Sequence, residues 1–270
     1  MAKVRVAVVM GGRSSEHDVS LDSARSVLGA LDPARYETLT VEIGRDGRWE
    51  LGSGSRPELE RDGRSAVETL PVPTSRVPES LAGVDVVFPV LHGPFGEDGT
   101  VQGLLELANV PYVGAGVTAS ALCMDKDLFK SVLRDKGVPV TKSVTLRDLD
   151  GFENPFGYPV FVKPARLGSS VGITKARSED ELRAGIELAF QHDEKVLVEE
   201  FVRGVEVECS VLGNEKPIAS IPGEIVANAD WYDYSAKYDE GGMELVIPPR
   251  VSPAAIERVQ ELSVEAFRVT

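Results

Sequence analysis

The sequence predicts an α/β protein whose first domain is built on an open parallel sheet. Residues 4–10 and 84–90 are continuous apolar runs, which is the composition of strands buried on both faces of a parallel sheet. The first run leads through a glycine-containing loop into a helical segment, and this order begins a βαβ unit. With roughly 100–200 residues to a domain, the 270-residue chain is expected to hold about two domains.

The remaining elements of the first domain follow in order. Residues 21–31 and 100–108 are expected to form helices, and residues 36–43 a strand. Residues 44–78 are rich in Gly, Ser, Pro and Arg and have weak periodicity, so we expect surface loops around a short helix there. The domain is expected to end at residues 110–114.

A second unit is expected to begin near Val117. Residues 125–136 predict a charged amphipathic helix that Gly137 closes. Further along, strands are expected at 159–163, 195–201 and 206–212, the last with the alternation of a half-buried strand, and a helix at 179–190.

A third segment is expected from Lys216 onward. It runs through a long irregular loop at residues 229–240 into a helix that begins at Ser252-Pro253. No closing glycine or strand follows that helix, so we expect the chain to be cut inside its last domain.

The composition excludes several classes of protein. An apolar content of 42% is enough to build cores, and a net charge of −14 argues against a nucleic-acid-binding protein. Cys123 and Cys209 are the two cysteines and lie far apart, which predicts neither a disulfide framework nor a metal site and suits a reducing compartment. No apolar stretch is long enough to span a bilayer. We therefore expect a cytoplasmic protein without a membrane or nucleic-acid partner.

The most informative segment is residues 161–173, which read FVKPARLGSSVGI. An apolar run delivers Lys163 to a loop of small residues between Gly168 and Gly172. Glycines let backbone N–H groups approach an anion, and a lysine supplies a mobile charge for phosphates. The loop differs from a Walker loop, because the chain has no G-x-x-x-x-G-K-[ST] string. From the loop alone, a nucleotide-binding lid and an ordinary hairpin are about equally favoured.

Two candidates lie in the loops that follow the parallel strands, where open α/β sheets bind ligands. Glu16 either holds a substrate ammonium or favours the positive end of the next helix, and an isolated Glu more often does the latter. His92 is one of three histidines, and a lone loop histidine is more often structural than catalytic.

The later candidates also have two interpretations each. Lys126 and Lys163 are by default surface charges, but a lysine that closes an apolar strand is costly to bury without an anion. The carboxylates around Glu199 and Glu206 either face solvent or adjoin a purine and its ribose. The aromatic residues 231–238 form either a loop packed by its own rings or a lid over the site.

In their order, these segments make the chain similar to the D-alanine–D-alanine ligase family of ATP-grasp enzymes, which act in peptidoglycan precursor synthesis. The resemblance spans nearly the whole chain except residues 44–78. The matching motifs are Gly11-Gly12 with residues 16–21, His92-Gly93 with residues 96–100, Met124-Asp125-Lys126, Lys163-Pro164 with residues 168–172, residues 199–206, and residues 232–238. Six motifs in the family's order are a specific signal.

The resemblance implies an ATP-grasp fold with three parts. These are an N-terminal open parallel α/β domain (1–116), a central α+β ATP-binding domain with a lid hairpin (117–213), and an incomplete C-terminal α+β ATP-binding domain (214–270).

The resemblance also implies the site residues. Catalysis would involve Glu16, Ser169 and Tyr238, which would share a hydrogen-bonded set around the ammonium of the first D-alanine. Val19 and His92 would bind the first substrate. ATP would be bound through its phosphates, adenine and ribose by Lys126, Phe161, Lys163, Ser170, Glu199, Glu200, Val202, Glu206 and Lys237. Glu200 stands where the family has a lysine, so a side-chain contact to the adenine is in doubt there.

The implied reaction joins two D-alanines at the expense of ATP through an acyl phosphate, and Tyr238 favours an amine over a hydroxy acid as second substrate. The family's Mg²⁺ ligands are expected beyond residue 270, so none is assigned here and the 270-residue chain is expected to be inactive. A homodimer is expected from the family. The alternatives are another ATP-grasp ligase, a non-catalytic nucleotide-binding protein, and an interaction module without nucleotide affinity.

Overall fold

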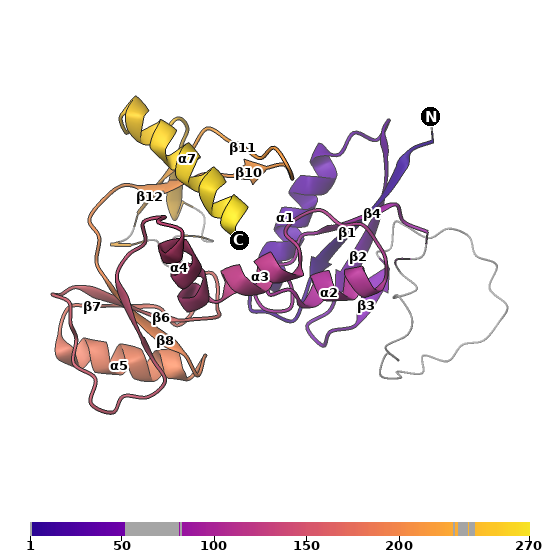
Figure 1. Ribbon diagram of the computed structural model, residues 1–270. Helices are drawn as coiled ribbons and strands as arrows, with labels where there is room; N and C mark the ends of the chain where they lie inside the picture. Colours follow the sequence, from indigo (N-terminus) through magenta and orange to yellow (C-terminus); the bar gives the residue numbers. More distant parts are fainter. Residues whose placement is uncertain (1, 52–80, 82, 229, 232–236, 238–240) are drawn as a thin grey trace. The chain divides into compact units, whose positions relative to one another are not determined.

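The computed structural model describes residues 2–51, 81, 83–228, 230–231, 237 and 241–270, and it divides into two compact units, Met1–Ala121 and Leu122–Thr270 (Figure 1). The division into three domains at residues 116 and 213 stays a prediction. No helix in the described part of the chain is long and apolar enough to cross a membrane.

The first unit contains a four-stranded sheet in the order β3-β2-β1-β4. β1 pairs in parallel with β2 and β4, as predicted, and β3 joins the edge antiparallel to β2. Its strands are β1 (Val4–Gly11), β2 (Tyr36–Ile43), β3 (Trp49–Leu51) and β4 (Val86–Pro89), and its helices are α1 (His17–Ala30) and α2 (Thr100–Leu107). Helix α3 (Val117–Met124) contains the boundary between the two units. In the segment 44–78, where surface loops around a short helix are expected, the structure has β3; residues 52–80 lie outside the described residues, so the short helix stays a prediction.

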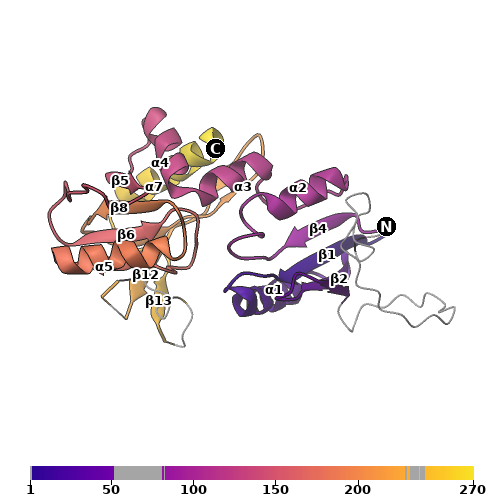
Figure 2. The same cartoon turned by 90° about the horizontal axis from the view of Figure 1, so that it is seen from below.

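The sheet of this unit has a core on each face. Ala7 and Val9 of β1 pack with Val101 and Leu105 of α2, whereas Val6 and Val8 pack on the other face, against α1. Because side chains alternate along a strand, a run that is apolar at every position supplies both cores at once. Figure 2 shows α1 and α2 on opposite faces of the sheet.

Helix α1 begins at His17, one turn before the predicted start at residue 21. Its first turn is polar but points inward: the Ser20 hydroxyl accepts from the Gly11 amide (2.8 Å) and donates to the Val90 carbonyl. The His17 ring nitrogen Nδ1 lies 2.8 Å from the Gly12 carbonyl oxygen. A search for apolar periodicity misses this turn because its buried side chains are polar.

The second unit is organised around an antiparallel sheet in the order β5-β8-β6-β7. The predicted hairpin is confirmed, because β6 and β7 are antiparallel and enclose the glycine loop. The elements are α4 (Lys126–Asp135), β5 (Ser143–Leu146), β6 (Val160–Pro164), β7 (Thr174–Ala176), α5 (Glu179–Phe190) and β8 (Val196–Glu200). Helix α5 covers one face, where Leu182 and Ile186 pack on Val160, Val162 and Val198 (Figure 1).

The rest of the unit holds two small sheets and a helix. One sheet has the order β13-β12-β9 and the other pairs β10 with β11. The strands are β9 (Glu206–Glu208), β10 (Val211–Leu212), β11 (Ile218–Ala219), β12 (Gly223–Ala227) and β13 (Met243–Val246), and the helix is α7 (Pro253–Val269). Ser252 caps α7 as predicted, and its hydroxyl accepts from the Ala255 amide.

The single strand predicted at 206–212 is wrong. The segment forms β9 and β10, which pair in different sheets, β9 with β12 and β10 with β11. Alternation along a sequence records which side chains share a face, but it carries no information on which partner a strand pairs with.

Candidate functional site

Strand alternation places a group of polar and aromatic side chains on the face of the β5-β8-β6-β7 sheet that α5 leaves uncovered. Val160 and Val162 of β6 belong to the core under α5, so Phe161 and Lys163 point the other way. Phe161 lies opposite Glu199 of β8 in the register. The sequence therefore builds one face of each strand for the core and the other for the candidate site.

Lys163 is paired with Glu199, which is a partner that sequence analysis did not predict for it. Lys163 Nζ lies 2.5 Å from Glu199 Oε2, and Lys130 Nζ lies 2.7 Å from Glu199 Oε1. The Glu199 side chain is 5% exposed. Burial by itself would raise the pKa of this carboxyl, but Lys163 and Lys130 together hold it below its ordinary value. The negative charge that balances Lys163 is thus the Glu199 carboxylate of the protein itself.

Lys126 points at the base of the glycine loop. Its ammonium donates to the carbonyl oxygens of Pro164 and Ala165, each at 3.3 Å, and to that of Leu167. Burial, followed by repulsion from Lys163, lowers its pKa from 10.5 to about 8. Lys126 is a cation in a setting that does not fully solvate it, and an added anion would stabilise its charge.

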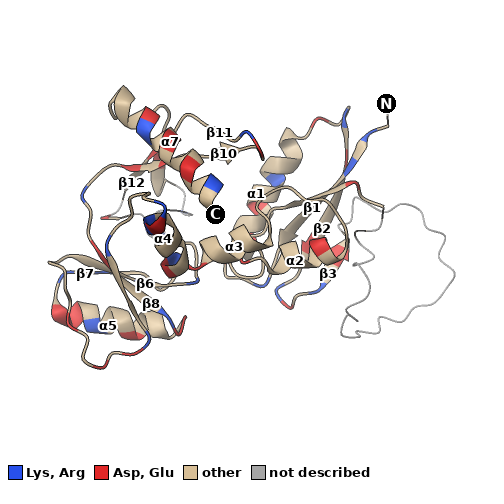
Figure 3. Cartoon of the chain, in the orientation of Figure 1, with Lys and Arg blue, Asp and Glu red and all other residues tan. Residues whose placement is uncertain are grey.

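A second buried ion cluster holds helix α4, which carries Lys126 and Lys130, in its position. Lys195 Nζ, on a side chain 7% exposed, lies 2.6 Å from Asp125 Oδ2 and 3.3 Å from Asp127 Oδ2. Asp125 also caps α4, accepting from the amides of Asp127 and Leu128. Figure 3 shows acidic and basic residues side by side on this helix.

The tip of the glycine loop is a tight hairpin turn, in which the Val171 amide donates to the Gly168 carbonyl oxygen at 3.2 Å. Ser169 and Ser170 have φ angles of 49° and 60°, two consecutive residues in the left-handed region, and Gly172 follows at 68°. A Cβ at Gly172 would lie 2.7 Å from His192 and 2.9 Å from Pro164, so only glycine fits. The loop's base is fastened by Asp193, which accepts from the Arg166 amide (2.8 Å) and guanidinium.

An aromatic cluster lies beside Lys163. The rings of Phe161 and Trp231 meet edge to face at 5.5 Å, and Phe201 lies 6.2 Å from Phe161. Asp230, next to Trp231, is held by Lys175 of β7 at 2.9 Å and by Arg177. The segment that leads into residues 232–238 is therefore tied to the hairpin of the glycine loop.

Three further predicted ATP ligands belong to β8 and the residues after it. Glu200 accepts from the Lys142 amide at 3.0 Å, and Val202 is 60% exposed. Partial burial raises the pKa of Glu206, and Lys237 acts against that rise, so these two predicted residues are brought together. Predicted Tyr238 lies outside the described residues.

In the first unit, the loops after β1 and β4 bring Glu16 close to the backbone beside His92. Glu16 is 4% exposed, and a Cβ on Gly93 would lie 2.2 Å from its Oε2, so the carboxylate packs directly on this backbone. Glu16 occupies the N-cap position of α1 without a capping hydrogen bond from its side chain, so the substrate-binding and helix-end interpretations both stay predictions. His92 Nε2 lies 3.0 Å from Ser23 Oγ, and half-buried Val19 follows Glu16 on α1.

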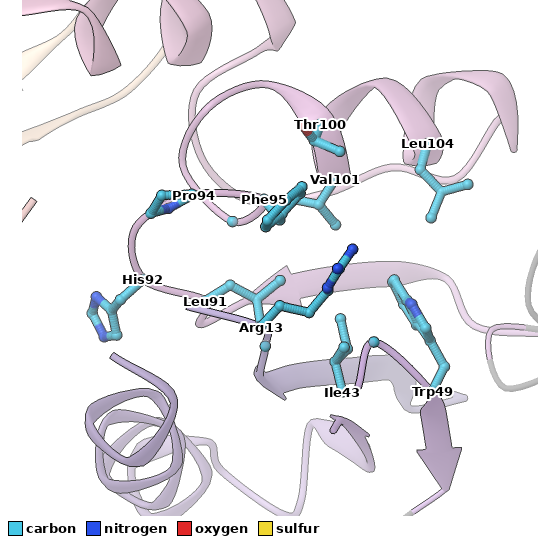
Figure 4. Close-up of a pocket in the computed structure, with 13 residues that line it drawn as sticks. Arg13, Ile43, Trp49, Leu91, His92, Pro94, Phe95, Thr100, Val101 and Leu104 are labelled. Carbon is cyan, nitrogen blue, oxygen red and sulfur yellow. The ribbon is translucent and has the colours of Figure 1, made fainter. Parts of the chain in front are cut away.

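A pocket of about 290 Å³ adjoins these loops. Its wall is mostly apolar, and Figure 4 shows Arg13 reaching between Phe95 and the side chains of Ile43 and Trp49. The Arg13 guanidinium carbon lies 4.9 Å from the centre of the Phe95 ring. His92 contributes to the rim, while its ring points away from the apolar side chains (Figure 4).

Sequence reasoning missed three residues of the second unit's cluster: Lys130, Lys175 and Asp230. Lys130 had a signal, because it stands one helical turn after Lys126 and so shares its face. Lys175 and Asp230 had none, since their ion pair joins positions far apart in the sequence. Among the described residues, no group of three His, Cys, Asp or Glu could hold a metal ion.

Two family models cover most of the chain. One described as D-ala D-ala ligase N-terminus matches residues 5–115, and one described as D-ala D-ala ligase C-terminus matches residues 132–270. A D-alanine–D-alanine ligase of Natranaerobius thermophilus is 45% identical over 289 residues, covering 100% of this chain and 79% of the relative.

Solved structures show the same likeness. VanG D-Ala:D-Ser ligase from Enterococcus faecalis superposes with a TM-score of 0.81 at 36% identity, covering 99% of this chain and 83% of that one. The D-alanine–D-alanine ligase of Coxiella burnetii gives 0.80 at 34% identity, covering 100% and 78%.

Proposed function

The chain belongs to the D-alanine–D-alanine ligase family, and from this premise we propose that it uses ATP to join two D-alanines into D-alanyl-D-alanine for peptidoglycan precursors. The observation that carries the proposal is the lysine cluster of the second unit. Lys126 and Lys163 converge at the glycine loop, where Lys126 donates to three backbone carbonyls and is incompletely solvated as a cation.

The chemistry explains why ATP is needed. A carboxylate does not react with an amine at neutral pH, because the oxygen that must leave is a poor leaving group. Transfer of the γ-phosphoryl group to the first D-alanine gives an acyl phosphate and ADP. The amine of the second D-alanine then attacks the acyl carbon, the C–O bond breaks, and inorganic phosphate leaves. The protein's part is positioning and charge stabilisation.

Lys126 and Lys163 are assigned to the phosphates of ATP. The support is their position on either side of the start of the glycine loop, with Ser169 and Ser170 at its tip. A phosphate would accept hydrogen bonds that Lys126 now gives to backbone carbonyls, and its charge would raise the pKa of this lysine toward its ordinary value.

The adenine and ribose are assigned to the neighbouring aromatic face. Phe161 supplies a ring, while Glu199, Glu200 and Val202 belong to the strand edge and its extension. Glu206 is assigned to the ribose hydroxyls, and Lys237 lies close enough to affect its titration.

The first D-alanine is assigned to Glu16, Val19 and His92. A buried carboxylate is a suitable partner for an ammonium, and His92 adds a hydrogen-bonding ring held by Ser23. The catalytic set of Glu16, Ser169 and Tyr238 rests on the sequence resemblance. So does the preference for an amine as the second substrate, which is assigned to Tyr238.

Family enzymes use Mg²⁺ with ATP, and the described residues include no group of three His, Cys, Asp or Glu that could hold a metal ion. The roles proposed in nucleotide and D-alanine binding are therefore those of the chain's own side chains. A cytoplasmic location is supported by the use of ATP. A homodimer is supported by the family resemblance and is tested by light scattering on the purified protein.

The proposal is tested by two measurements. Calorimetric titration with ADP measures nucleotide binding, and ADP release from ATP and Mg²⁺ is followed with and without D-alanine. Release that depends on D-alanine, and on D-alanine rather than D-serine or D-lactate as the second substrate, is expected of the protein expressed through its natural stop codon, whereas the 270-residue chain is expected to bind ADP without turnover. Lys163→Met should abolish both signals, whereas Lys216→Met, at an exposed position, should leave them unchanged. ADP binding without D-alanine-dependent release by the protein expressed through its natural stop codon would favour a nucleotide-binding protein instead.

A further inference from the structure

Lys130 of α4 takes part in an arrangement that the family's implied ligand set does not include. Its ammonium lies 2.7 Å from one oxygen of Glu199, while Lys163 lies 2.5 Å from the other. Two lysines therefore share one carboxylate. The carboxylate is 5% exposed, so its charge is compensated by these side chains rather than by water.

Lys130 is fixed in this position. Its ammonium also donates to the Thr141 carbonyl at 2.9 Å and to the Thr141 hydroxyl at 2.5 Å, and its side chain is only 12% exposed. All three protons of the ammonium have acceptors in the protein. Lys130 is thus held away from solvent, with no donor left for a ligand.

Lys163 differs from Lys130 in its exposure and surroundings. Its side chain is 25% exposed, and its ammonium lies 5.4 Å from the centre of the Phe161 ring on the candidate site's face. Lys163 is therefore the member of the trio that a ligand can reach.

The charges of the trio do not cancel. Lys130 and Lys163 each carry one positive charge and Glu199 one negative charge, so one positive charge is left over. If Glu199 were paired with Lys163 alone, the pair would be neutral and would attract a phosphate weakly.

We propose that Lys130 is a positioning residue for nucleotide binding, which neutralises Glu199 so that the charge of Lys163 is left for a phosphate. The inference rests on the proposed function and adds a residue to it. Lys130 touches neither substrate nor nucleotide; it acts through Glu199.

The test compares ADP binding, by calorimetry, in the parent chain and in Lys130→Met, Lys130→Gln and Lys130→Arg. Methionine keeps the chain length without charge, and glutamine keeps a donor for Glu199 without charge. The charge of Lys130 would act on the phosphate through Glu199 and Lys163, over roughly 12 Å. At an effective dielectric constant near 20, a unit charge at that distance changes the affinity for ADP by roughly tenfold. Both neutral variants should bind ADP about that much more weakly, and arginine should stay within roughly threefold of the parent.

Two further readouts separate this role from simple damage to the fold. The loss of nucleotide affinity in the neutral variants should become smaller as the salt concentration is raised, because the effect is electrostatic. It should also be smaller for AMP than for ADP, because ADP carries more phosphate charge. The matched control is Lys136→Met, at the exposed end of the same helix, where the lysine pairs with Asp135 at 3.1 Å. Its affinity should equal that of the parent.

Each result has a defined meaning. A parent chain that binds no ADP would defeat the proposed function itself. A parent that binds ADP, with neutral variants that bind it equally well, would overturn the role of Lys130. Equal losses for ADP and AMP at every salt concentration would also overturn it, because they would indicate structural damage. If Lys130→Met does not fold, as judged by circular dichroism, Lys130→Gln decides the question.

Discussion

The lowered pKa of Lys126 predicts that nucleotide binding weakens as the pH rises from 7 to 9. The ammonium is charged below a pKa of about 8 and increasingly neutral above it, because burial and Lys163 both disfavour the charge. A bound phosphate would restore the charge. Binding above this pKa must therefore take up a proton, and the affinity falls as protons become scarce.

The magnitude follows from the pKa. With a value of about 8, Lys126 is charged in roughly nine molecules of ten at pH 7 and one of ten at pH 9. If only the charged form binds ADP tightly, the affinity falls about tenfold over this range, or ~1.4 kcal/mol. Proton uptake on binding should rise from about 0.1 to about 0.9 over the same interval.

Calorimetric titration with ADP in buffers of different ionisation enthalpy measures both quantities. The matched variant is Lys126→Arg, whose guanidinium stays charged throughout. It controls for titration of the nucleotide itself, and its affinity should be nearly level from pH 7 to 9. Equal falls in parent and variant, or a parent whose affinity does not change, would refute the assignment of Lys126 to the phosphates.

The same pKa shift affects stability in the opposite direction. Between about pH 8 and 10.5 the unfolded chain binds more protons at this lysine than the folded chain does. The free energy of unfolding contributed by Lys126 should therefore increase with pH through that window, while nucleotide affinity decreases.

Three other predictions follow from burial and contacts. Asp193→Ala removes the acceptor of two backbone amides and of the Arg166 guanidinium, so it should lower the free energy of unfolding by about 2 kcal/mol in urea titrations; an unchanged midpoint would contradict this. Leu182→Ala, at a side chain 1% exposed, should cost about 2–5 kcal/mol, whereas Leu188→Ala on the same helix, 40% exposed, should cost under about 1 kcal/mol; similar losses would show that the core is misplaced. Glu16→Gln, in the protein expressed through its natural stop codon, should raise KM for D-alanine at least about tenfold while ADP affinity stays at the parent value, since the carboxylate is assigned to the substrate ammonium; a loss of ADP affinity alone would count against that role.

Sequence reasoning located the parts of the site better than their partners. The parallel strands, the glycine hairpin and α4 all follow from local composition and periodicity. The pairing of Lys163 with Glu199 does not, because it depends on the register of β6 against β8, and these strands are separated by the whole of α5.

The elements of the fold that were predicted incorrectly have a similar cause. The first turn of α1 is buried through hydrogen bonds of Ser20 rather than through apolar contacts, so hydrophobic periodicity does not detect it. The split of residues 206–212 into β9 and β10 is decided by β12 and β11, which come later in the chain. Information of this kind is held in long-range contacts, which a local pattern does not contain.

The edge-to-face contact of Trp231 with Phe161 provides an optical probe of the second unit. The chain has two tryptophans, and the other, Trp49, lies in the pocket wall of the first unit. Replacing Trp49 with phenylalanine leaves all indole emission to a ring beside the proposed adenine face. Replacing Trp231 leaves the emission to the apolar pocket. A pair of single-tryptophan proteins can thus follow each unit separately by fluorescence, without an attached dye.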